Sequence, residues 1–140
     1  MSLSSATAWR HSDRGNHLTL PIFALLTASP DVVTLLREGA IIKAFRAGKA
    51  PQDVRPPYVT WSIVADPPVQ TMDGAGMDHF RVQVNCFAVD EEQCVALDNA
   101  VMRAIEKDGE NASLGLSIDD TDPPTGLYRR SRDFSLWMPR

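Results

Sequence analysis

The sequence predicts an α+β domain, because two stretches have the pattern of strands and a third has the pattern of a long helix. Tyr58–Ala65 is dense in β-branched and aromatic residues, which favour strands. Residues 79–86 alternate apolar and polar side chains with the period of two that a half-buried strand requires. Residues 91–107 instead repeat apolar side chains at helical spacing.

Length and composition predict a single domain. The chain has 140 residues, 44% of them apolar and 23% charged, which is enough to bury a core without disulfides. Its formal net charge of −4 argues against a protein that binds nucleic acid by coating phosphates. Residues 1–17 are polar and lack the apolar core of a secretory signal. We therefore expect a flexible arm over residues 1–17 and one domain over residues 18–140.

A short helix is expected at the start of the domain. Residues 18–27 (LTLPIFALLT) fit a helix that begins near Thr19, because Pro21 is tolerated only in a first helical turn. The side chains expected to be largely buried in it are Ile22, Phe23, Leu25 and Leu26.

A second short helix should follow directly. Residues 29–31 (Ser-Pro-Asp) supply an N-cap, a proline for the first turn and an acid near the positive helix end. Gly39 is expected to end this helix in a C-cap role. Ile41 and Ile42 then suggest a short strand, and the proline-rich residues 46–57 suggest a loop.

Residues 66–78 (DPPVQTMDGAGMD) separate two predicted strands that we expect to pair as a hairpin. Two prolines and two glycines make a regular element improbable here. Hairpin loops usually take about 2–5 residues, and longer loops in small domains are usually functional or disordered. This segment is therefore the first candidate for a contact surface.

The long helix is bounded by clear signals. Asp90 is a natural N-cap and Gln93 could complete a capping box, while Gly109 should end the helix. Beyond it, residues 114–118 alternate as a further strand would, residues 119–126 (DDTDPPTG) resemble a turn-rich loop, and residues 127–138 form a last strand. One face of that last strand should be apolar only in its second half, because Arg130 and Arg132 occupy the first.

No constellation of residues points to catalysis or to a bound metal. The three histidines, His11, His17 and His79, are not clustered with other ligand types. The acidic run at residues 119–122 lacks the glycine and the terminal glutamate of a calcium loop. Cys86 and Cys94 are expected to be buried free thiols.

Charge placement leaves two interpretations open. Acidic residues crowd residues 106–122, whereas Arg129, Arg130 and Arg132 lie together on the last predicted strand. These charges could simply solvate loops and protect an edge strand from aggregation. Alternatively, they could form two patches of opposite sign on different surfaces, which would suit a head-to-tail contact that closes into a ring.

The order of these elements resembles a known family. The chain has an Ser-Pro-Asp-capped helix, a proline-rich loop followed by residues 57–60 (PYVT), the strand at residues 81–87 (RVQVNCF), the Asp-Glu-Glu-Gln helix and the ending at residues 127–134 (LYRRSRDF). Over about residues 18–138 this arrangement is similar to the tail completion proteins of long-tailed bacteriophages, also called tail terminator or tail-to-head joining proteins.

The resemblance implies a fold and a role. The fold would be a twisted, mostly antiparallel sheet of about four to five strands, with helices packed on one face and a long β-hairpin loop. The role would be structural, without catalytic residues, cofactors or metal. Made in the host cytoplasm, the protein would form a ring, typically a hexamer, at the head-proximal end of the virion tail. It would sit on the tail tube protein, end tube growth and dock the head connector, while DNA passes through the lumen without specific binding.

A set of residues is expected to make the contacts between subunits or with the tube. They come from the long loop, the polar face of the strand after it and the last strand: Gln70, Thr71, Met72, Asp73, Met77, Asp78, Arg81, Gln83, Arg129, Arg130 and Arg132. Two alternatives remain open, a head-to-tail connector or stopper ring protein and, with less support, a small cytosolic binding domain.

Overall fold

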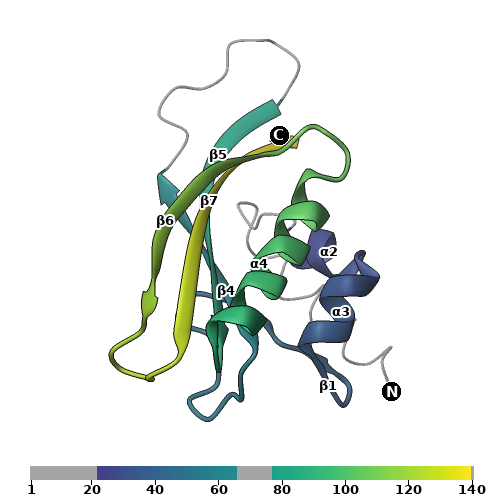
Figure 1. Ribbon diagram of the computed structural model, residues 1–140. Coiled ribbons are helices and arrows are strands. Elements are labelled where there is room, and N and C mark those ends of the chain that lie inside the picture. The colour runs from purple at the N-terminus through teal and green to yellow at the C-terminus, as the bar shows by residue number, and fades with distance from the viewer. Residues whose placement is uncertain (1–21, 66–76, 140) are drawn as a thin grey trace.

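Two layers make up the protein, a five-stranded sheet and a layer of helices on one of its faces (Figure 1). The computed structural model describes residues 22–65 and 77–139. Within them the helices are α2 (Ile22–Thr27), α3 (Pro30–Leu36) and α4 (Glu91–Glu106). Figure 1 shows α4 lying along the sheet, with α2 and α3 beside it on the same side. The predicted α+β class, with helices packed against the sheet, is confirmed.

The sheet is mixed, with the strand order β3-β4-β5-β7-β6. Its long central strands, β5 (Met77–Ala88) and β7 (Tyr128–Pro139), run antiparallel along their whole length. Strand β4 (Tyr58–Ala65) pairs antiparallel with β5, and β6 (Ala112–Thr121) pairs antiparallel with β7. The expected pairing of the strands on either side of the long loop is therefore confirmed.

The strand registers place residues from all four antiparallel strands in common rows across the sheet. One row joins Ala65, Arg81, Ser135 and Ala112, from β4 at one side to β6 at the other. A second row, which lies three residues further along β5, joins Trp61, Val84, Arg132 and Leu116. Because residues in one row point to the same face, the rows show which side chains meet the helices.

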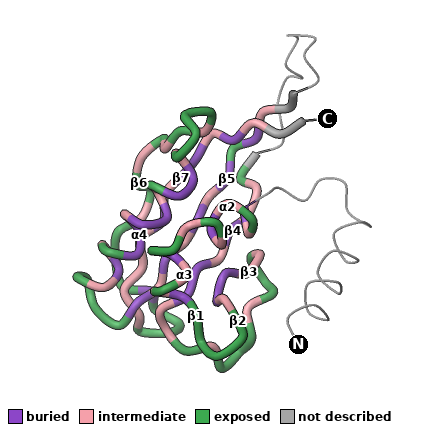
Figure 2. Tube along the Cα trace, turned by 90° about the vertical axis from the view of Figure 1, so that its right-hand side faces the viewer, coloured by how far each residue is buried: buried purple, intermediate pink, exposed green. Residues whose placement is uncertain are grey.

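The core lies between the sheet and α4. Inward-pointing side chains of β4, β5 and β7 meet the apolar face of α4, and Figure 2 shows buried residues running along these elements. Helices α2 and α3 pack beside α4 and extend the core toward β3. The fully buried side chains that contribute most volume are Trp61, Phe134, Ile22, Leu26, Leu36, Leu97, Ile105 and Leu136.

Local capping signals determine where α3 and α4 begin. The Ser29 hydroxyl accepts a hydrogen bond from the Val32 amide at 3.4 Å, and Pro30 occupies the first turn of α3. At α4 the Asp90 carboxylate accepts from the Gln93 amide at 2.8 Å. The Gln93 side chain in turn accepts from the Val89 amide at 3.1 Å, so both predicted helix starts are confirmed.

The expected role of Gly39 is wrong. Helix α3 ends at Leu36, and Arg37 already has an extended backbone with ψ of 132°. The chain then forms β1 (Arg37–Glu38), which pairs with β2 (Ile41–Ile42) in a separate two-stranded sheet. Gly39, with φ of +64°, lies in the turn between them, where its freedom to adopt positive φ serves a hairpin.

Several element boundaries also differ from the expectation. Strand β3 (Ala44–Arg46), parallel to β4, was not predicted, because three residues are too few to show a periodic pattern. Strand β5 begins at Met77, so Met77 and Asp78 belong to the strand and not to the loop. Strand β6 continues to Thr121 and includes Asp119 and Asp120, which we expected in a loop.

The expected helix start near Thr19 and the expected loop at residues 66–76 lie outside the described residues. Within α2, Ile22 and Leu26 are buried as expected. Phe23 and Leu25 are only partly buried, because a helix of this length presents one narrow face to the core.

Candidate interaction surfaces

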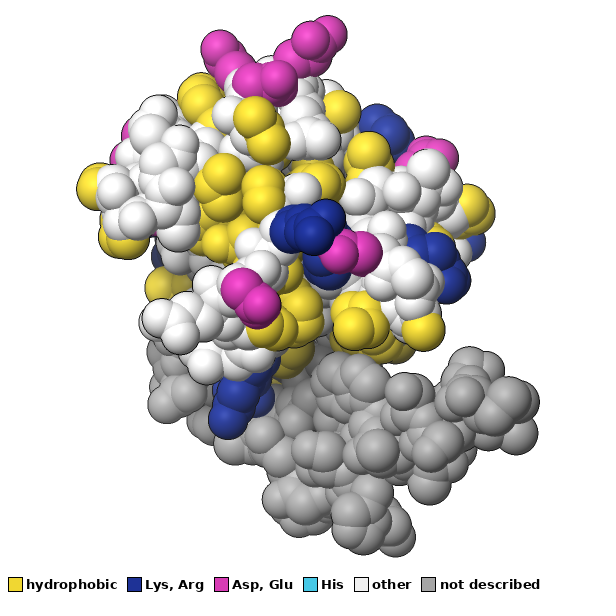
Figure 3. All heavy atoms as spheres, turned by 90° about the horizontal axis from the view of Figure 1, so that it is seen from below, with side chains coloured by type: hydrophobic (Ala, Val, Ile, Leu, Met, Phe, Trp, Pro, Cys, Tyr) yellow, Lys and Arg dark blue, Asp and Glu magenta, His cyan; other side chains and the backbone are white. Residues whose placement is uncertain are grey.

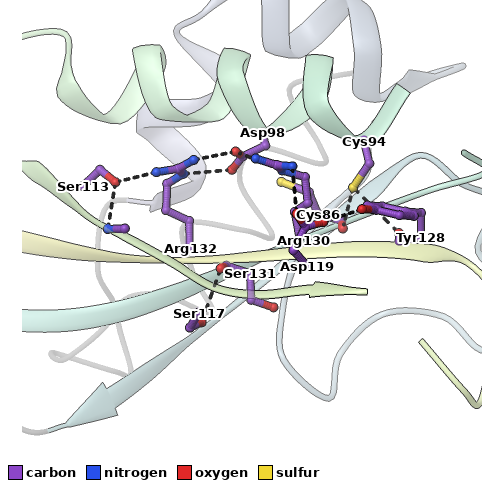
Figure 4. Close-up of polar contacts among 11 residues, drawn as sticks. Cys86, Cys94, Asp98, Ser113, Ser117, Asp119, Tyr128, Arg130, Ser131 and Arg132 are labelled. Carbon is purple, nitrogen blue, oxygen red and sulfur yellow. Dashed lines mark hydrogen bonds and ion pairs between the residues drawn. The ribbon is translucent and has the colours of Figure 1, made fainter. Parts of the chain in front are cut away.

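A buried carboxylate joins α4 to the sheet. Asp98 lies on the apolar face of α4 and is 1% exposed. Figure 4 shows Asp98 reaching from α4 to two guanidinium groups that rise from β7. Arg132 donates to both carboxylate oxygens, at 3.1 and 2.8 Å, and Arg130 donates to one of them at 3.4 Å. Two basic side chains of the last strand are thus held between the layers.

Further polar groups complete this inner cluster. The hydrogen bonds that Arg132 donates to Asp98 raise the pKa of Arg132, against the opposing effect of its burial, so its charge is retained. Arg132 also donates to the Ser113 hydroxyl at 2.9 Å, and the Ser113 amide donates to Glu106 at 2.8 Å. The cluster therefore fixes both the end of α4 and the beginning of β6 relative to β7.

Arg129 points to the opposite face of the sheet and is also paired. Its guanidinium donates to both carboxylate oxygens of Asp120 at 3.1 Å and to Asp122 at 3.0 Å. The hydrogen bonds that Arg129 donates to Asp120 raise the pKa of Arg129. Because Asp120 and Asp122 come from β6 and the turn after it, these bonds clamp the β6–β7 hairpin at its closed end.

These pairs correct the interpretation of the charges as two separate patches. Arg130 donates to Asp119 of β6 at 3.4 Å in addition to Asp98, and the Tyr128 hydroxyl donates to the same aspartate. The acidic residues at 119–122 and the arginines of β7 are therefore neighbours across one hairpin. They neutralise one another within the protomer, and they lie in one place instead of on different surfaces.

The face of the sheet away from the helices carries a second polar network. Arg81 of β5 donates to the Asp133 carboxylate at 3.2 and 2.8 Å. The Gln83 amide donates to Asp133 at 3.4 Å and to Ser117 of β6 at 3.3 Å. Asp133 is 6% exposed, whereas the Arg81 side chain is 53% exposed. Arg81 is thus anchored by Asp133, while more than half of its side chain remains exposed.

The polar network continues across β4, β5 and β7. Asn85 donates to the Thr60 hydroxyl at 3.3 Å and accepts from the fully buried Ser131 hydroxyl. No helix covers this face of the sheet in the part of the chain that the structure describes (Figure 1). Arg81, Gln83 and Asn85 therefore share a polar face that no described helix covers.

A pocket of about 330 Å³ opens beside β2 and β3. Lys43 is 7% exposed and forms its floor, with its ammonium group 3.1 Å from Glu38 and 2.9 Å from the Arg55 carbonyl oxygen. The remaining lining residues are Ile41, Phe45, Pro51, Asp53 and Val54. The Lys43 ammonium group thus has one charged and one neutral partner within the chain, and these two contacts account for the burial of this side chain.

Apolar side chains are exposed at the two sides of the sheet and at one end of the protein. Val64 of β4 is 48% exposed, and Leu114 and Leu116 of β6 are 52% and 40% exposed. Seen from below, hydrophobic side chains gather in the middle of the lower end, among scattered basic and acidic groups (Figure 3). Exposed apolar groups of this kind mark contact surfaces when they are grouped.

The structure places the expected contact residues that it describes in four different positions. Gln70, Thr71, Met72 and Asp73 lie outside the described residues, and Met77 and Asp78 are the first residues of β5. Arg81 and Gln83 lie on the open face, whereas Arg130 and Arg132 point inward to α4 and Arg129 lies in the hairpin clamp. The structure therefore does not bring the set together on one surface.

Sequence reasoning missed Asp98 and the exposed apolar edge residues. A signal for Asp98 was available, because it lies four residues after Cys94 on the apolar stripe of α4, where a charge needs a partner. Arg130 and Arg132, whose parity on the last strand points inward, are that partner. No comparable signal existed for Leu114 and Leu116, since alternating apolar residues normally indicate a buried face.

The cysteines are free and buried, as predicted. Burial raises the pKa of Cys86 well above its usual value and that of Cys94 to about 11. The Cys94 thiol donates to the Cys86 carbonyl oxygen at 3.3 Å. Among the described residues there is no group of three His, Cys, Asp or Glu placed to hold a metal ion, and no helix is long and apolar enough to cross a membrane.

Comparison with known proteins identifies the family. No curated protein is significantly similar to the chain in sequence. Residues 21–139 match the family described as Tail completion protein gp17, and the match includes every described element from α2 to β7. The chain therefore belongs to the tail completion protein gp17 family, and its role is that of a structural protein of the bacteriophage tail.

Proposed function

We propose that the protein forms a ring at the head-proximal end of the phage tail tube. There it ends polymerisation of the tube and offers the docking surface for the head connector. The observation that carries this proposal is the family match over residues 21–139. A ring of about six copies, placed on the last ring of tail tube subunits, is the form in which we expect the protein to act, with DNA passing through its lumen.

The chemistry of the described residues supports a role through surface contact and not through catalysis. The charged groups that are most buried, Asp98 and Asp133, bind arginines within the same protomer. Their positions are explained by holding the layers and strands together. The net charge of −4 is also suited to a lumen that must pass DNA without binding it.

Among the expected contact residues, Arg81 and Gln83 are the strongest candidates for direct contact with a neighbour. They lie on the open face, and Asp133 holds their side chains in place. Such preorganised polar groups lose little entropy on binding. We propose that Arg129, Arg130 and Arg132 contribute indirectly, by fixing the β6–β7 hairpin, and that residues 70–73 together with Met77 and Asp78 contact the tube or the next subunit.

The test is to make phage particles without this protein. We expect overlong tails that carry no head, because polymerisation of the tube is no longer stopped and the docking surface is absent. Adding purified protein to tube protein in vitro should shorten the tubes and place a ring at one end in electron micrographs. Tails of normal length that lack only the head would instead support the connector or stopper role.

The contribution of the long segment before β5 can be tested separately. Shortening residues 70–76 should leave folding intact, because β5 begins at Met77 and pairs with β7 over its whole length. We expect the shortened protein to bind tubes more weakly in a sedimentation assay while its thermal unfolding temperature is unchanged. Loss of the folded state, seen by circular dichroism, would contradict this assignment.

A further inference from the structure

Among the described residues, each side of the sheet ends in a strand edge with an unpaired, uncharged stretch. On one side, β3 covers β4 only from Val59 to Trp61, and the Trp61 carbonyl oxygen accepts the last edge hydrogen bond, from the Ala47 amide at 2.8 Å. Beyond it, no described residue pairs with the outer edge of β4 at residues 62–65. On the other side, β6 is the last strand of the sheet.

These edges lack charged residues and proline, two of the features that keep an exposed edge from pairing. Monomeric proteins usually place charged residues or proline on edge strands. Residues 62–65 (SIVA) and residues 112–118 (ASLGLSI) contain neither. Each edge instead presents exposed apolar side chains, Val64 on β4 and both Leu114 and Leu116 on β6.

The two free edges also lie at the same level of the sheet. Ala65 and Ala112 belong to one row, and Ile63 and Ser113 belong to the next. Val64 and Leu114 occupy the irregular positions beside that second row, where the register of each strand shifts. A copy of the protein moved sideways along the sheet would therefore bring β6 beside the free part of β4.

Strand directions make this contact an antiparallel one. Strand β4 is antiparallel to β5, β5 to β7, and β7 to β6, so β4 and β6 run in opposite directions. The neighbouring copy would thus continue the sheet in the antiparallel pattern that its own strands already use. Because the two edges are different, the contact is head-to-tail, the kind that closes into a ring.

The charged side chains beside the two edges favour the same head-to-tail arrangement. Residues 37–55, beside the β4 edge, contain five basic and two acidic side chains. Of the six acidic side chains in residues 106–122, around β6, Asp119, Asp120 and Asp122 are already paired with Arg129 and Arg130. Asp108 and Glu110, just before β6, are exposed and form no ion pair with a described residue, and the same is true of Lys49 beside β4. Opposite charges therefore flank the two edges.

We infer that a second copy of this chain occupies each edge, so that residues 112–116 of β6 pair with residues 62–65 of β4 in the next subunit. The inference rests on the proposed ring and names the contact that builds it. Pairing is limited to this half of each strand, because β3 covers the rest of the β4 edge. Repeated around the ring, the contact joins the sheets of all subunits into one.

Crosslinking tests the contact in rings formed by the purified protein or on tail tubes. With a short bis-maleimide, the double variant Val64→Cys/Leu114→Cys should give a ladder of covalent multimers. Each single variant should give none, because a head-to-tail contact brings position 64 of one copy to position 114 of another. The wild-type protein serves as the control, since Cys86 and Cys94 are buried.

Three outcomes separate the inference from the proposed function. A ladder in the double variant alone supports the contact. Rings without any ladder, or dimers from Leu114→Cys alone, overturn this contact while leaving the ring intact. An absence of wild-type rings both in solution and on tubes overturns the proposed function together with the contact.

A charged residue substituted into the β6 edge provides an independent test of the contact. Leu114→Lys should lower the fraction of protein in rings by about tenfold or more, because it buries an unpaired charge between strands. Val89→Lys is the matched control, since Val89 is 66% exposed but lies outside both edges. Equal ring fractions for the two variants, with unchanged thermal unfolding, would contradict the inference.

Discussion

Asp98 allows the last strand to place two arginine side chains on the face that packs against the helices. Both arginines lie on the face of β7 that points to α4. Without Asp98, two positive charges would be buried there without this carboxylate. With it, Arg130 and Arg132 share one carboxylate that is 1% exposed, and their own side chains are 13% exposed. Buried charges of this kind depend on each other far more than surface pairs do.

Replacing Asp98 by alanine should therefore destabilise the protein strongly. We expect the free energy of unfolding to fall by about 3–5 kcal/mol, the usual cost of leaving a buried partner charge unpaired. Urea denaturation followed by circular dichroism measures this change. Asp31→Ala is the matched control, because Asp31 forms a 3.7 Å pair with Arg103 in which both side chains are more than half exposed. It should cost less than about 1 kcal/mol, and equal losses in the two variants would contradict the structural role of Asp98.

Cys94 provides a second prediction at the scale of a residue. Burial raises its pKa from 9.0 to about 11, so folding favours the neutral thiol. That contribution to stability is complete below about pH 9 and is lost as the pH rises to about 11. At pH 8 the native protein should react slowly with iodoacetamide and the urea-unfolded protein quickly. Equal alkylation rates in the two states would show that the thiol is accessible.

At the scale of elements, short-range signals determined helix boundaries well. Ser29 and Asp90 begin α3 and α4 as expected, because an N-cap satisfies amides only three residues away. The end of α3 was wrong, because Gly39 has the same preference for positive φ in a hairpin turn as in a helix C-cap. A glycine alone does not distinguish the two.

The N-cap of α4 can be tested directly. Asp90→Ala removes the acceptor of the Gln93 amide and should lower the free energy of unfolding by about 1 kcal/mol. Asp90→Asn keeps an oxygen acceptor and should cost only a few tenths of that value. Thermal unfolding of the three proteins at one pH gives the comparison. A larger loss for the asparagine variant would indicate that charge, and not the hydrogen bond, is the main contribution.

Strand identity was less predictable than helix identity. Residues 112–121 have the alternation of a half-buried strand, yet Leu114 and Leu116 are exposed because β6 is an edge that α4 does not cover. Strand β3 was missed because its three residues acquire their conformation from β4, through bonds such as that from the Val59 amide to the Lys43 carbonyl oxygen at 3.0 Å. The exposure of β6 and the conformation of β3 are therefore set by the neighbouring strands and not by local residue preference.

At the scale of the whole molecule, the charged side chains fall into two groups. Some form ion pairs within the protomer, and others are exposed at its sides. The arginines of β7 and the acids of β6 belong to the first group. Lys49 and the pair Asp108 and Glu110 belong to the second. Salt acts mainly on the exposed group, because buried pairs are screened much less.

Raising the salt concentration should therefore separate assembly from folding. Between about 0.05 and 0.5 M sodium chloride we expect the ring fraction to fall several-fold, since the Debye length becomes shorter than about 10 Å. The free energy of unfolding should change by less than about 1 kcal/mol. Analytical ultracentrifugation and urea denaturation at each concentration measure the two quantities. An unchanged ring fraction would mean that the flanking charges do not contribute to the contact.

The sequence by itself determined the α+β class, the central strands, the capped helix and the family, because these depend on neighbours along the chain or on patterns preserved over its length. Only the tertiary structure decided the partners of the charges and the exposure of the edges. Asp98 meets Arg130 and Arg132 across 32 and 34 residues, and the rows that align β4 with β6 follow from three successive strand registers. Such relations arise only when the strands pair, since a shift of one residue would turn every side chain to the other face.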